Sequence, residues 1–167
     1  MSKAAQQIIA IICQSSQFSP QLIASLPGGA DFSDALLEAA EQQALERNWG
    51  CICRLIWVMQ RLPNKDFVPL LCKLLDERAD EVYMEAVVDA LNIMSDVRAI
   101  EPLRRALSYR MPGDDLAFHF NKKVIGALAR IGTAEARTVI AEALQSSDEP
   151  IRVFAQEILR ELEKESV

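Results

Sequence analysis

Apolar positions between residues 63 and 162 recur in a short helical pattern that occurs three times. In two copies a proline is followed by leucines one and five residues later, and equivalent positions lie 33 residues apart: Pro69, Leu70 and Leu74, then Pro102, Leu103 and Leu107. A third copy at 137–144 ends 37 residues after the second, and another motif at 90–94 returns at 127–131. Two alternating helical patterns at a nearly constant period predict a stack of antiparallel helix pairs.

The spacing of apolar residues, with start and stop signals, predicts a chain built of helices throughout. Ser33 is the expected cap of the third helix, because its hydroxyl can accept hydrogen bonds from free amides of the first turn. The expected helices span residues 3–15, 19–26, 33–47, 49–62, 65–75, 80–94, 97–107, 118–131, 134–144 and 148–163.

The segment 49–62 is apolar almost all round, which is typical of a helix buried on several sides. It is expected to lie between an N-terminal helical subdomain, residues 1–47, and the repeats, residues 48–167. The subdomain is either a set of degenerate repeats or a different module. The last helix, 148–163, is rich in charged residues and is expected to cap the stack, whose final apolar face would otherwise stay wet.

Composition and charge narrow the classes of function. The chain has 167 residues, 50% of them hydrophobic and 25% charged, as in an ordinary globular domain. Its formal net charge of −6 argues against nucleic-acid binding, which depends on clustered Lys and Arg. An acidic chain suits a basic protein partner, or is simply soluble.

The N-terminal region and the cysteines bear on location. The apolar run 8–13 is too short to cross a bilayer, and residues 14–17 are a poor signal-peptide cleavage site, so no membrane contact and a cytoplasmic location are expected. The cysteines show no spaced disulfide framework and lie in apolar runs, which predicts buried free thiols in a reducing compartment. They are Cys13, Cys51, Cys53 and Cys72.

Candidate chemistry is sparse. Cys51 and Cys53 would point about 200° apart on a helix, and no second pair completes a metal site. His119 stands without a Ser, Cys or carboxylate at a recognised spacing. Since no nucleophile–base pair and no phosphate-binding glycine loop is found in the sequence, we expect neither an enzyme nor a cofactor.

Three segments resemble a known family. Residues 148–159 resemble the outer-helix signature of HEAT repeats, in particular the short HEAT-like type named after phycobilisome lyases. Residues 131–136 and 94–99 are similar to the turn between the two helices of that repeat. The resemblance covers about residues 48–163 and implies an all-α fold, a right-handed α-solenoid of HEAT-like antiparallel helix pairs.

Functions within the superfamily are diverse, and the resemblance implies no single one. Its members include scaffolds, chromophore-lyase subunits, chaperones, metal-dependent hydroxylases, DNA glycosylases and small bacterial binding proteins. The hydroxylases carry paired His-Glu steps for iron, whereas His119 is followed here by Phe120. The glycosylases need a basic groove, and the sequence contains no long Lys/Arg stripe.

The connector 108–119 is the first candidate binding surface. Its inserted residues lengthen the repeat period, and insertions in solenoids form loops on one edge, often the binding edge. Its candidate binding residues are Tyr109, Arg110, Met111, Asp114 and Asp115. The alternative is an ordinary connector whose Met111 and Leu116 lie in the core.

Two helix faces are further candidates. Solenoids usually turn their inner helices toward a concave face, where Glu101, Arg104 and Arg105 would project. On the preceding outer helix carboxylates recur every four residues and form one acidic stripe: Glu81, Glu85 and Asp89. The stripe could dock a basic protein. For both faces simple solvation is the alternative.

We therefore expect a non-catalytic protein-binding module, most concretely a small acidic bacterial immunity protein that neutralises a toxin by covering its surface. This expectation combines size, charge and the resemblance. The repeat subtype suggests an alternative, a lyase-like or chaperone-like helper of a tetrapyrrole protein, and a general assembly scaffold is a third. The sequence does not indicate the oligomeric state.

Overall fold

The computed structural model describes residues 1–14, 19, 21–22, 26, 29–78, 81–109 and 114–164, and for residues 81–83 and 114–117 it describes the backbone alone.

Every regular element among these residues is a helix, so the expected all-α class is confirmed. The α-helices are α1 (Lys3–Ile12), α3 (Ala30–Leu45), α4 (Trp49–Arg61), α5 (Val68–Glu77), α6 (Glu81–Met94), α7 (Ile100–Ala106), α8 (Asp114–Ile131), α9 (Ala134–Glu142) and α10 (Glu149–Lys164). Three short 3₁₀ turns adjoin them: η1 (Lys65–Phe67), η2 (Val97–Ala99) and η3 (Ala143–Gln145).

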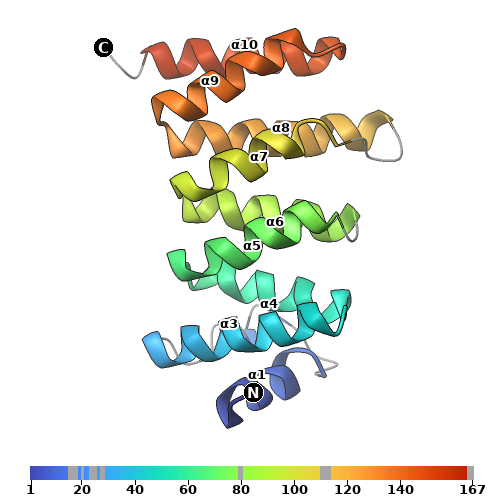
Figure 1. Ribbon diagram of the computed structural model, residues 1–167, viewed down its shortest axis with the longest axis vertical. Coiled ribbons are helices and arrows are strands. Elements are labelled where there is room, and N and C mark those ends of the chain that lie inside the picture. The colour runs from blue at the N-terminus through green and yellow to red at the C-terminus, as the bar shows by residue number, and fades with distance from the viewer. Residues whose placement is uncertain are drawn as a thin grey trace.

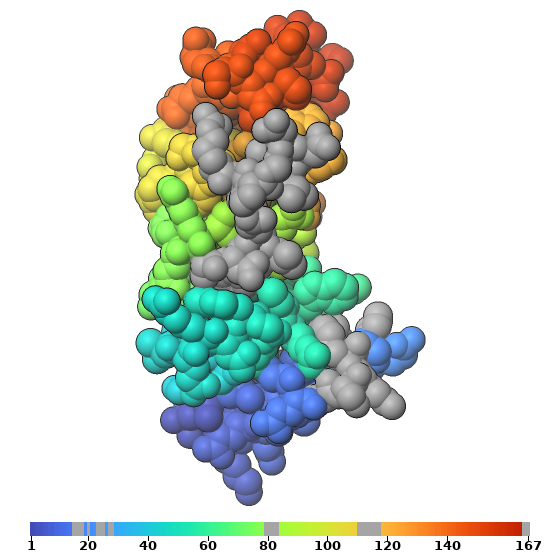
Figure 2. Space-filling view, turned by 90° about the vertical axis from the view of Figure 1, so that its right-hand side faces the viewer, coloured from blue at the N-terminus to red at the C-terminus, as the bar shows by residue number. Residues whose placement is uncertain are grey.

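The helices form two layers that rise along the long axis in chain order (Figure 1). Helices α3, α5, α7 and α9 make the front layer, and α4, α6, α8 and α10 make the rear layer, in which each helix packs on the next. The rear helices begin 32, 33 and 35 residues apart, at Trp49, Glu81, Asp114 and Glu149. Helix α1 packs on α3 and α4 at the lower end. Seen from the right-hand side of Figure 1, the surface also runs from α1 to α10 in chain order (Figure 2).

The turns on one edge share a local design. Side chains of Asn64, Asp96 and Thr133 each accept a hydrogen bond from a backbone amide two or three residues later, at 2.9, 3.0 and 3.2 Å. These caps satisfy amides that a helix start leaves free. Ser95 and Gly132 reverse the chain just before two of the caps with positive φ angles of 48° and 72°. Capping side chains and residues with positive φ angles thus end one helix and begin the next at regular intervals.

The core is one continuous apolar region between the layers, and among the described residues three polar side chains are buried as well: Gln43, Asp96 and Asn121. Gln43 and Asp96 have hydrogen-bond partners. Asn121 on α8 is 1% exposed, and neither of its amide atoms has a hydrogen-bond partner. The register that pairs residues 90–94 with 127–131 aligns Asn121 with Met84 on α6, which is 4% exposed. An amide therefore occupies a position that the preceding helix pair fills with an apolar side chain.

Several helix boundaries in the structure differ from those expected from the sequence. Helix α3 begins at Ala30 after Gly29, whose φ of 111° suits glycine, so the expected cap at Ser33 is wrong. Helix α8 begins at Asp114 instead of 118, and Asp114 and Asp115 belong to the helix rather than to a connector. Most of the expected helix 19–26 lies outside the described residues.

The cysteine prediction is wrong for one pair. Cys13, at the end of α1, forms a disulfide with Cys51 in the first turn of α4. Cys53 and Cys72 take no part in it. Burial, with a contribution from Asp76, raises the pKa of the Cys72 thiol to about 11, so this side chain is protonated at neutral pH. The pairing was not apparent from the sequence because it depends on α1 lying beside α4, which is a feature of the tertiary arrangement.

Replacing both Cys13 and Cys51 by Ser should lower the free energy of unfolding by about 4 kcal/mol, because the disulfide closes a loop between residues 38 positions apart. Urea unfolding of the oxidised protein and of the double variant measures this difference. Cys72→Ser is the control and should have a much smaller effect. Equal stability of the oxidised protein and the double variant would show that the disulfide does not constrain the unfolded chain.

Replacing Asn121 by Leu should raise the free energy of unfolding by about 1–3 kcal/mol, since it removes a buried amide without partners and adds apolar contacts. The check is thermal and urea unfolding beside the matched change Asn92→Leu on α6, a half-buried position. A less stable Asn121→Leu protein would contradict the prediction and indicate that the amide has a bound partner.

Candidate protein-binding surface

The front layer is linked by an ion pair between α5 and α7. Arg105 donates two hydrogen bonds to the Asp76 carboxylate, Nε to Oδ1 at 3.0 Å and Nη2 to Oδ2 at 2.7 Å. Arg105 was expected to project toward a partner, and half of its side chain is exposed. Its guanidinium is nevertheless already held by a bidentate carboxylate, which fixes its orientation.

A second set of ion pairs links α7 to α9. Arg104 pairs through Nη1 with Glu101 at 3.0 Å and through Nη2 with Glu142 at 3.2 Å. Its Nε is buried and has no hydrogen-bond partner. A hollow of about 370 Å³ lies beside this cluster, lined among others by Arg104, Ser108, Glu142, Ser146 and Ile151. The sequence placed Glu101 and Arg104 on one surface, and the structure brings them into contact.

Tyr109 lies beneath this surface rather than on it. Its side chain is 3% exposed, its ring stacks on Phe120 at 6.4 Å between centroids, and the Arg78 guanidinium lies 3.6 Å from its centroid. Its hydroxyl is 3.4 Å from Asp76 Oδ1. Tyr109 thus joins α5 and α8, and its ring has no face left for a partner.

The remaining connector residues can be placed only in part. Arg110 and Met111 lie outside the described residues. Asp114 and Asp115 open α8, and their side chains are not described.

The acidic stripe of α6 is partly neutralised by α8. Lys123 Nζ lies 3.1 Å from a Glu85 oxygen and 2.7 Å from a Asp89 oxygen. Burial opposes the charge of Lys123, but hydrogen bonds with Asp89 and Glu85 outweigh it and raise the pKa of the ammonium group. The side chain of Glu81 is not described. Two of the three stripe carboxylates therefore hold adjacent repeats together.

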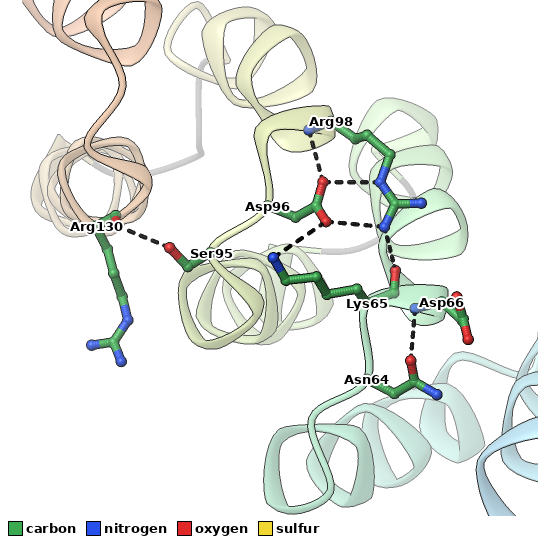
Figure 3. A network of polar contacts seen from close by, with 7 residues as sticks. All are labelled: Asn64, Lys65, Asp66, Ser95, Asp96, Arg98 and Arg130. Atoms are coloured by element: carbon green, nitrogen blue, oxygen red, sulfur yellow. Dashed lines mark hydrogen bonds and ion pairs between the residues drawn. The ribbon is translucent and has the colours of Figure 1, made fainter. Parts of the chain in front are cut away.

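A polar network joins three successive turns on the edge that carries the caps (Figure 3). The buried Asp96 carboxylate accepts hydrogen bonds from Arg98 Nε at 2.9 Å and Nη2 at 3.0 Å, and lies 4.0 Å from Lys65 Nζ. Arg98 also donates to the Lys65 carbonyl at 2.7 Å, and the Ser95 hydroxyl donates to the Arg130 carbonyl at 2.9 Å. Hydrogen bonds from Arg98 lower the pKa of Asp96 to about 2. The network fixes one repeat against the next.

Helix α3 carries a group of carboxylates that was not among the candidates expected from the sequence. They occur at spacings of three, four and three residues, which places them on one face of the helix: Asp31, Asp34, Glu38 and Glu41. Helix α3 contains no Lys, Arg or His. The same spacing rule that identified the α6 stripe would have found them.

No family model, curated protein or solved structure matches the chain. Among the described residues, no helix has the length and apolar character needed to span a membrane, and no three His, Cys, Asp or Glu side chains are grouped as metal ligands.

Replacing Asp96 by Asn should lower the free energy of unfolding by about 2 kcal/mol at neutral pH, because the charge-assisted hydrogen bonds from Arg98 are lost while an oxygen remains to cap the turn. The folded pKa of Asp96, about 2, lies below the ordinary value near 3.9. The stabilisation is therefore fully present above about pH 4 and is lost as pH falls toward 2.

Urea unfolding of both proteins between pH 7 and 2 tests this prediction. The exposed Asp66→Asn change is the control and should have little effect at any pH. A difference between wild type and Asp96→Asn that stays constant down to pH 2 would contradict the role of the carboxylate charge.

Proposed function

We propose that the chain is a right-handed α-solenoid of HEAT-like helix pairs that binds another protein and catalyses no reaction. The support for the architecture is the repeated sequence motif together with two helical layers that follow chain order (Figure 1). Stacked repeats present extended surfaces to which each repeat contributes equivalent positions. Such surfaces suit recognition of a macromolecule.

The observation that carries the proposal is the charged ladder on α5, α7 and α9. Five side chains from three helices form it: Asp76, Arg105, Glu101, Arg104 and Glu142. All are partly exposed, so their outer atoms remain available while the internal pairs hold them in place. A surface ordered before binding loses less side-chain entropy when a partner arrives.

The net charge of −6 favours a basic partner. In its most concrete form, the proposal describes an immunity protein that neutralises a toxin by covering its active or substrate-binding surface. Acidic groups would replace a nucleic-acid substrate if that toxin is a nuclease. We place the protein in the cytoplasm, where the Cys13–Cys51 pair would have to resist reduction or function as two thiols.

Capture from a lysate of the source organism, at low and moderate salt with mass spectrometry of the bound proteins, should yield one basic protein that is held tightly. Titration calorimetry of the purified pair then measures affinity. A coloured biliprotein in its place would favour the tetrapyrrole helper, and the absence of any retained protein would contradict the proposed function.

The charge reversals Glu81→Lys, Glu85→Lys and Asp89→Lys, made together, should weaken binding at least about tenfold and make it less sensitive to salt, if the α6 stripe faces the partner. Lys123→Gln is the matched control, since it breaks the same internal pairs but leaves the carboxylates in place. Affinity of the control should be retained or increased. An unchanged affinity of the triple variant would remove the α6 stripe from the proposal.

A further inference from the structure

An apolar hollow opens at the N-terminal end of the stack, between α1 and α3. Its volume is about 310 Å³, and its apolar lining includes Ile8, Ile11, Leu26, Phe32 and Ala35. Ile11 is 45% exposed although it belongs to a strongly apolar helix. The hollow is large enough for a bulky apolar side chain from another molecule.

The carboxylates of α3 continue from the rim of this hollow. Asp31 is one of its lining residues, and the helical spacing carries the row onward through Asp34, Glu38 and Glu41. Asp31, Asp34 and Glu41 are exposed and form no ion pair with any described residue. We call these three the α3 stripe.

Glu38, unlike the three residues of the α3 stripe, forms contacts within the chain. Its Oε1 accepts a hydrogen bond from the Ser2 amide at 2.6 Å and lies 3.4 Å from the N-terminal amine of Met1. These contacts lower the pKa of Glu38, with the Ser2 hydrogen bonds as the largest cause. Glu38 thereby holds the start of α1 against α3 and shapes the hollow, while the α3 stripe is left without counter-charge.

We propose that the hollow and the α3 stripe together dock a basic amphipathic helix of the partner protein. One apolar side chain of that helix enters the hollow, and Lys or Arg residues at spacings of three and seven positions contact Asp31, Asp34 and Glu41. The stripe extends over ten residues of helix, about 15 Å, with Asp31 and Asp34 one turn apart and Glu41 two turns further on. A helix lying alongside repeats its charges at the same interval, so the two rows stay in register.

The negative charge of the α3 stripe disfavours nucleic acid, anionic lipid and a second copy of this chain as occupants of the site. Nucleic-acid phosphates and anionic lipid headgroups would be repelled by the α3 stripe. A second copy of this chain would bring an identical row of carboxylates to the same place. The opposite end of the stack differs, because α10 exposes charges of both signs, among them Arg160, Glu161, Glu163 and Lys164.

This inference rests on the proposed function and adds to the charged ladder a second contact surface at the N-terminal end of the stack. A synthetic helix provides a test that needs no natural partner. The probe is a fluorescent helical peptide of roughly 18 residues, with a leucine stripe flanked by lysines three and four positions apart. In a control peptide every lysine is replaced by glutamate. Fluorescence anisotropy should show saturable binding of the lysine peptide to the full-length protein and none of the glutamate peptide.

Two variants locate the site. The triple reversal Asp31→Lys, Asp34→Lys and Glu41→Lys should weaken binding of the lysine peptide at least about tenfold in about 50 mM salt. Ala4→Trp, at an exposed lining position, should fill the hollow and weaken binding without a change of charge. The control Glu157→Lys, Glu161→Lys and Glu163→Lys alters net charge equally on α10 and should leave affinity within about twofold.

Equal losses for the α3 and α10 reversals would overturn the proposal, since binding would then follow net charge alone. Unchanged affinity of Ala4→Trp would overturn the part played by the hollow. A captured natural partner that binds the α3 reversal as tightly as wild type would overturn this site while the proposed function stands. Failure to capture any partner contradicts the proposed function, whereas the peptide measurements still report on the site.

Discussion

Ion pairs cross from one helix pair to the next in both layers of this stack and favour one register of each helix against its neighbour. Apolar burial supplies most of the attraction between helices but is non-directional. Asp76–Arg105 and Arg104–Glu142 join the front helices, and Lys123 joins α6 to α8 in the rear layer. Each pair links residues on successive repeats, so a slip of one helix along the next would break them. Much of the charge within the repeats is therefore committed to the fold.

The repeated pattern was enough to predict the helices because it records burial, and burial recurs with each repeat. The ends of the helices were harder to predict. Ser33 has the chemistry of a cap, but α3 starts earlier at Ala30, which brings Phe32 against α1 and Asp31 to the rim of the hollow. A local preference for Ser was overridden by packing of an additional helical turn. The start of α8 at Asp114 likewise shortens what looked like a long inserted loop.

Candidate surface residues could be paired from the sequence within one helix but not between helices. Glu101 and Arg104 are three residues apart, so their contact follows from helix geometry. Arg104 and Glu142 meet only because α7 lies beside α9, which requires the tertiary arrangement. Tyrosine is a residue type that is enriched at interfaces, yet the ring of Tyr109 packs in the core beside Phe120. Residue type alone does not distinguish a side chain that faces a partner from one that faces the next repeat.

The acidic stripes on α6 and α3 differ in the neighbouring helix that each of them faces. Both are rows of carboxylates at helical spacing, and the sequence presents them alike. Helix α6 lies between two rear-layer neighbours, one of which supplies Lys123 opposite Glu85 and Asp89. Helix α3 has α1 on its outer side, and α1 contains a single cation, Lys3, which forms no ion pair with a described carboxylate. The interior helix α6 obtains a counter-charge from α8, whereas Asp31, Asp34 and Glu41 on α3, near the end of the stack, form no ion pair with a described residue and stay open to one from another molecule.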